Sequence, residues 1–68
     1  MEKVDRSLLK EINRNEYHAD VPDLGWKFGR IEEFEVPGPG TFRLTDTTGW
    51  VTNYAQESGD AKITVFID

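Results

Sequence analysis

The chain has 68 residues, no cysteine and a formal net charge of -5. A chain of this length has room for one small core, so we predict a single domain over residues 1–68. The lack of cysteine excludes a disulfide scaffold and a thiolate metal site. No apolar run is long enough for a transmembrane helix. The acidic balance disfavours nucleic acid and anionic membranes as partners, because both are bound mainly through lysine and arginine.

The acidic excess lies mainly in the second part of the chain. Residues 1–20 carry four basic and five acidic groups, whereas residues 21–68 carry four basic and eight acidic groups. This distribution favours a basic protein as partner. The chain opens on Met1 without a basic and then apolar leader, so we expect a complete small gene product with a cytoplasmic location.

The first predicted element is an N-terminal helix. Val4, Leu8 and Ile12 recur at every fourth position, which places them on one face of a helix of about three turns. Asp5 is the expected N-cap, because its side chain can accept a hydrogen bond from the first free backbone N–H groups. The helix is expected to fray by Glu16, and residues 18–24 are predicted to form a connector.

The next predicted element is a strand that ends before the Pro-Gly-Pro-Gly loop at residues 37–40, because proline donates no hydrogen bond to a sheet. A short connection sets Phe34 opposite Phe42 and Glu33 opposite Arg43. The alternation slips just before Phe34, which predicts a bulge at Glu33 or at the residue before it.

The Asp-Thr-Thr-Gly stretch at residues 46–49 predicts a type I turn followed by a left-handed glycine. The favoured closure sets Phe42 opposite Tyr54 and gathers the large apolar groups, including Trp50, on one face. A closure shifted by one residue would put Phe42 beside Asn53 and leave Trp50 and Tyr54 on the opposite face.

A second turn at Ser58 and Gly59 predicts a hairpin that pairs Tyr54 with Ile63 and Thr52 with Val65. The two hairpins then share one alternation of apolar and polar positions. The predicted fold class is therefore α+β, with the N-terminal helix packed on one face of a four-stranded antiparallel meander sheet in the order αββββ.

Few residue patterns point to chemistry. His18, Asp20 and Asp23 could in principle ligate a divalent metal, but they are better explained as exposed and turn residues around Pro22. The acidic run of residues 32–35 lacks the cleft that paired catalytic carboxylates need. We therefore predict no catalytic, metal or cofactor site and no enzymatic activity.

The aromatic residues are more informative about function. The predicted register turns Phe66 to the outer sheet face, directly opposite Val51. Trp26 and Phe28 join this patch if the irregular segment before it turns them outward. An apolar patch next to a carboxylate run resembles a contact surface. The predicted protein-binding residues are Phe66, Val51, Glu33, Glu35, Trp26 and Phe28.

The leading hypothesis is a small acidic protein-binding module, an adaptor or inhibitor of a larger protein, that uses this outer face. The alternative is an assembly subunit that oligomerises through the last strand, residues 63–67, which is expected to be an unpaired edge of the sheet. A third hypothesis is single-stranded nucleic-acid binding by outward aromatics beside Arg30, Arg43 and Lys62.

Overall fold

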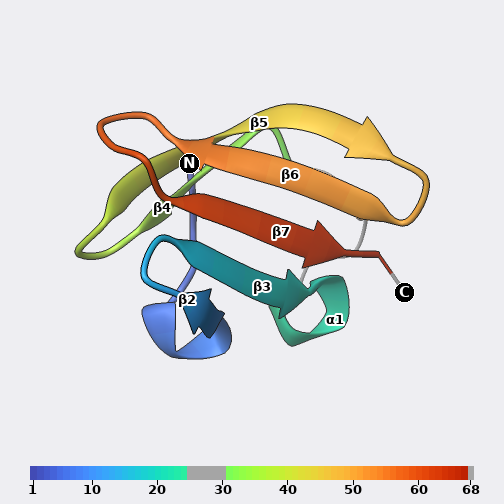
Figure 1. Ribbon diagram of the computed structural model, residues 1–68, viewed down its shortest axis with the longest axis horizontal. Helices are drawn as coiled ribbons and strands as arrows, with labels where there is room; N and C mark the ends of the chain where they lie inside the picture. The colour runs from blue at the N-terminus through green and yellow to red at the C-terminus, as the bar shows by residue number, and fades with distance from the viewer. Residues whose placement is uncertain (25–30, 68) are drawn as a thin grey trace.

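The computed structural model describes residues 1–24 and 31–67. The elements in these residues are β1 (Glu2–Lys3), η1 (Arg6–Leu8, a 3-10 turn), β2 (Lys10–Asn13), β3 (Glu16–Asp20), α1 (Val21–Leu24), β4 (Glu33–Val36), β5 (Gly40–Thr48), β6 (Val51–Gln56) and β7 (Lys62–Phe66). Across the described part of the chain, seven strands form one mixed sheet in the order β1-β4-β5-β6-β7-β3-β2 (Figure 1). The predicted α+β fold of one helix on a four-stranded meander is therefore wrong.

The N-terminal segment forms strands and a 3-10 turn where a helix was predicted. β2 and β3 pair as a hairpin that closes between Asn13 and Glu16. The Asn13 side chain accepts a hydrogen bond from the Asn15 backbone N–H at 3.2 Å and donates one to the Glu16 carboxylate at 2.9 Å. Asparagine favours a tight turn in this way. The local turn chemistry therefore prevails over the four-residue apolar spacing.

Asp5 caps the chain as predicted, but it caps the turn η1 and not an α-helix. Its carboxylate accepts a hydrogen bond from the Ser7 backbone N–H at 2.9 Å, and this bond lowers the pKa of Asp5. The predicted stripe does not pack as a unit, because Val4 is 2% exposed whereas Leu8 is 40% and Ile12 51% exposed.

The predicted connector over residues 18–24 is wrong in its first half, which belongs to β3. Tyr17 and Ala19 point into the core and are buried. β3 pairs in parallel with β7, with Tyr17 opposite Ile63 and Ala19 opposite Val65. In Figure 1, β7 lies between β6 and β3, so the last strand is not the sheet edge that was predicted.

Two predicted pairings are confirmed. β4 and β5 set Phe34 opposite Phe42 and Glu33 opposite Arg43, without the predicted bulge in this ladder. β6 and β7 set Tyr54 opposite Ile63, and they also pair Thr52 with Val65 and Val51 with Phe66 as predicted. Correct turn chemistry and correct alternation coincide in both pairs.

The predicted ladder between β5 and β6 is wrong. Phe42 lies opposite Gln56 and Leu44 opposite Tyr54, and the register then shifts between Leu44 and Asp46. The extra residue in the shifted strand is Thr45, which forms a bulge. The two closures considered from the sequence put Phe42 opposite Tyr54 or Asn53, and both are wrong because they place the turn too early in the chain.

The turn between β5 and β6 explains where Trp50 lies. Thr48 pairs with Val51, which leaves Gly49 and Trp50 as a two-residue loop. Gly49 has φ 55°, confirming its predicted left-handed conformation, and glycine suits the first loop position of such hairpins. Trp50 is 75% exposed, so its predicted core position is wrong.

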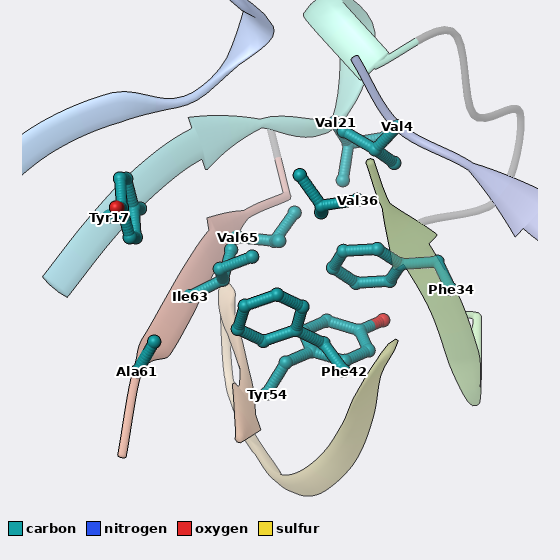
Figure 2. Packing of buried hydrophobic residues seen from close by; sticks show 10 residues of the cluster. All are labelled: Val4, Tyr17, Val21, Phe34, Val36, Phe42, Tyr54, Ala61, Ile63 and Val65. Atoms are coloured by element: carbon teal, nitrogen blue, oxygen red, sulfur yellow. The ribbon is translucent and has the colours of Figure 1, made fainter. Parts of the chain in front are cut away.

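The sheet curls around one apolar cluster. Its buried residues are Val4, Tyr17, Val21, Phe34, Val36, Phe42, Tyr54, Ala61, Ile63 and Val65 (Figure 2). The rings of Phe34 and Phe42 stack at 5.8 Å, and Tyr54 meets Phe34 edge-on at 4.7 Å. The Val4 backbone N–H donates to the Glu35 carbonyl oxygen at 2.8 Å. The inner face of the sheet is thus filled by the side chains of this cluster.

Candidate protein-binding surface

The outer face of the sheet carries three bands of side chains that run across the strands. Because side chains alternate along each strand, these residues lie on the face of the sheet that points away from the core. The charged band consists of Glu33, Arg43, Ala55, Lys62 and Glu16. The polar band consists of Asp46, Asn53, Thr64, His18 and Lys10. The aromatic band consists of Val51, Phe66 and Asp20, with Trp50 beside it in the loop.

The charged band holds an arginine between two carboxylates. The Arg43 guanidinium lies 3.3 Å from the Glu33 carboxylate and 3.5 Å from that of Glu57. A side-chain hydrogen bond with Glu57, and secondarily desolvation and the Glu57 charge, raise the pKa of Glu33. Because the two carboxylates share one guanidinium, the group keeps one negative charge in excess, and such solvent-accessible ion pairs contribute little to stability.

The polar band is a ladder of hydrogen bonds between side chains. The Asn53 amide donates to the Asp46 carboxylate at 3.1 Å, and the Thr64 hydroxyl donates to the Asn53 side-chain oxygen at 2.9 Å. The Thr45 hydroxyl donates to the Asn53 backbone carbonyl at 3.0 Å. Donors and acceptors here satisfy one another, which holds the middle of the outer face in one arrangement.

The aromatic band is less self-contained. Phe66 pairs across the sheet with Val51 on one side and Asp20 on the other. The His18 ring meets the Phe66 ring edge-on at 5.3 Å. An open hollow lies at this end of the sheet, lined by Asp20, Trp50, Phe66 and Ile67. Two aromatic side chains and one carboxylate therefore border the same concave surface.

Asp20 lacks the partner that most carboxylates of the outer face have; Glu35 of β4 is the other described outer-face carboxylate without one, but it does not line the hollow. Glu33 and Glu57 share Arg43, and Asp46 accepts from Asn53. By contrast, within residues 1–24 and 31–67 the Asp20 carboxylate has neither an ion pair nor a hydrogen bond. Asp20 is partly buried as a residue. Its unpaired carboxylate is free to interact with a positively charged or hydrogen-bonding group from outside.

The structure brings only some of the predicted site residues together. Phe66 and Val51 are paired as predicted, and both are half-buried on the outer face. Glu33 and Glu35 belong to β4, three strand spacings from β7, or about 14 Å away across the sheet. Glu33 also lies about 13 Å further along the strands, because it is in line with Lys62 and not with Phe66, and Glu35 lies about 20 Å further. The predicted acidic flank is therefore separate from the aromatic band.

Trp26 and Phe28 lie outside the described residues. Sequence reasoning missed Trp50 and Asp20 at the aromatic band, and also His18 of the polar band, whose ring packs against Phe66. Trp50 was assigned to the core, and the other two were assigned to a connector. The alternation of Tyr17, Ala19 and Val21 with His18 and Asp20 is the signal that could have identified β3 and its outer face.

Other kinds of site find little support in the described residues. No group of three or more histidine, cysteine or acidic side chains there is arranged to hold a metal ion. No described helix is long and apolar enough to cross a membrane.

Comparisons of the chain with protein-family models, with curated proteins and with solved structures find no match. The candidate surface is therefore defined by the geometry and chemistry of its own residues.

Proposed function

We propose that this protein is a protein-binding module whose contact surface is the aromatic band, centred on Phe66 and Trp50. The observation that carries the proposal is the position of Trp50, which is 75% exposed beside a hollow that Phe66 also lines. Aromatic residues supply much of the binding energy in protein interfaces, and tryptophan is the most enriched among interface hot spots.

The surroundings of the aromatic band support this proposal. A contact surface usually combines an apolar centre with a polar rim. Here Val51 and Phe66 form the centre, and the hydrogen-bonded ladder of Asn53 and Thr64 lies along one side. The ladder belongs to paired strands in the middle of the sheet, so the partner would meet a surface that needs little rearrangement.

The alternative of assembly through the last strand has less support. Both sides of β7 are occupied, by β6 and by β3, so β7 has no free edge for a second copy. β2 is the longer of the two edge strands in the described sheet, and its pairing with β3 shifts between Glu11 and Asn13. Bulges of this kind on an edge disfavour pairing with another chain.

Single-stranded nucleic-acid binding also has less support. Proteins that bind single strands by stacking bases on aromatic side chains place cations beside those side chains. Arg43 and Lys62 lie in the charged band, away from Phe66, and Arg43 already contacts two carboxylates. Arg30 lies outside the described residues.

Photo-crosslinking tests the proposed function. A photoreactive phenylalanine analogue replaces Trp50 in one protein and Ser58, an exposed residue in the turn at the opposite end of β6 and β7, in a control protein. In a lysate of the source organism, we expect a discrete crosslinked product from position 50 and not from position 58. Excess unlabelled wild-type protein should suppress this product.

Competition with a variant makes the test specific. Excess Phe66→Ser protein should suppress the product much less than the wild type does, while Phe66→Ser itself costs under about 1 kcal/mol of stability because it loses only pair contacts on the outer face. Equal competition by the two proteins, or the same product from position 58, would contradict the proposed surface.

A further inference from the structure

We propose that the hollow between Trp50, Phe66 and Asp20 is a receptor for a lysine or arginine side chain of the partner protein. This inference rests on the proposed function and adds the chemistry that the partner must present. It is carried by one juxtaposition: an exposed indole, a phenyl ring and an unpaired carboxylate line the same concavity. A cation in such a place interacts with the faces of the rings and with the carboxylate together.

Other groups fit the hollow less well. An apolar side chain would cover the Asp20 carboxylate without giving it a partner, and burying an unpaired charge is costly. An anionic side chain would be repelled by the Asp20 carboxylate at close range. It would also be repelled by the protein as a whole, whose net charge is -5. A neutral donor can hydrogen-bond to the carboxylate, but a basic side chain also balances its charge and gains cation–π contact with Trp50 and Phe66.

No cation of the chain itself occupies this place among the described residues. In the described part of the chain, the only ion pairs are those that Arg43 forms, and Arg43 lies in the charged band, away from the hollow. His18 packs its ring edge against Phe66, which supports the phenyl ring from the neighbouring strand. The receptor is therefore built by two strands and one loop, namely the ends of β3 and β7 and the loop that bears Trp50, and it is open to a side chain from outside.

Peptide titrations test the proposal. The 15N-labelled protein is titrated with a short, otherwise neutral peptide that carries one lysine, and with the same peptide carrying norleucine, which keeps the aliphatic stem but lacks the charge. We expect the lysine peptide to shift the Trp50 indole signal and the amide signals of Asp20 and Phe66. The norleucine peptide should bind about tenfold more weakly or produce no shift.

Matched variants assign the effect to the receptor. Asp20→Asn should lower the affinity for the lysine peptide about tenfold, and Trp50→Leu should lower it about two- to fivefold. The control is Asp60→Asn, which changes the net charge equally but lies in the exposed turn at the opposite end of β7. It should leave the affinity nearly unchanged. Thermal midpoints close to that of the wild type confirm that each variant is folded.

Several outcomes would overturn the cation receptor. They are equal binding of the lysine and norleucine peptides, equal effects of Asp20→Asn and Asp60→Asn, or no shift at Trp50, Asp20 and Phe66. Tetramethylammonium that reproduces these shifts at lower concentration than the peptide would also overturn it, in favour of a free small cation. If partner crosslinking at position 50 persists in any of these cases, the proposed binding surface stands and only its charge preference fails.

Discussion

The two faces of the curled sheet use aromatic residues in opposite ways. On the inner face, Phe34 and Phe42 are fully buried and Tyr54 is 1% exposed, with each ring packed against another. On the outer face, Phe66 is half-buried and Trp50 is 75% exposed beside an open hollow. Burial by the chain itself, and not residue type, separates the aromatics that stabilise the fold from those available to a partner.

The largest expected difference between the faces is in the effect of removing a ring. Phe42→Ala should lower the free energy of unfolding by about 3 to 5 kcal/mol, because it leaves a cavity in the core. Such a loss is comparable to the whole stability of many small domains. Trp50→Ala, the matched change on the exposed side, should alter stability by less than about 0.5 kcal/mol. Urea denaturation measures both, and similar losses in the two variants would abolish the distinction.

A smaller difference should appear between two threonines. Thr52 is fully buried on the inner face, and its hydroxyl lacks a hydrogen-bond partner among the described residues. Thr52→Val replaces the hydroxyl with a methyl group of similar size, so it should raise stability by about 1 to 3 kcal/mol.

The matched change on the outer face is Thr64→Val. The Thr64 hydroxyl donates to Asn53 at 2.9 Å, so its loss should lower stability by about 0.5 to 1.5 kcal/mol. Urea midpoints of the two variants should therefore move in opposite directions. A fall in stability for Thr52→Val would mean that its hydroxyl has a favourable interaction on the inner face.

The smallest expected effect is a dependence of folding stability on pH that arises from Glu33 on the outer face. A side-chain hydrogen bond with Glu57 raises the pKa of Glu33 above its ordinary value of 4.5. The folded chain therefore binds more protons than the unfolded chain between the two pKa values, so this carboxyl group's contribution to stability falls as pH rises through that window. Glu33→Gln should flatten this decline. Urea midpoints from pH 4 to pH 8 measure it, and parallel curves for both proteins would show that Glu33 does not cause the decline.

The sequence predicts the pairing of strands wherever a turn and an alternation agree. Phe34 opposite Phe42, and Tyr54 opposite Ile63, follow from short connections and from the shared apolar face. The predicted ladder between β5 and β6 failed because the turn was placed at residues 46–49, whereas β5 runs on to Thr48 and the hairpin closes through Gly49 and Trp50. The bulge at Thr45 then changes the register of the remaining pairs by one residue.

The prediction for the N-terminal third of the chain failed for a different reason. Val4, Leu8 and Ile12 have helical spacing, but only Val4 is buried, and it is held by the Glu35 carbonyl. The partner strands that decide this arrangement, β4 and β7, lie far away in the sequence. Local spacing alone contains no information on such distant partners. Asp20 and His18 were missed because the local alternation of β3 was interpreted as a connector, while Phe66 and Val51 were found because their pairing is local.

The parallel pairing of β3 with β7 has a consequence for the order of folding. Tyr17 and Ile63 are neighbours in the sheet but lie 46 positions apart in the chain. Closing so long a loop has an entropic cost that a short hairpin does not have. We therefore expect β4, β5 and β6 to associate first and the parallel pairing of β3 with β7 to follow as a slow step. The aromatic band spans this seam, because Asp20 comes from one side and Phe66 from the other, so binding competence should arise only at the end of folding.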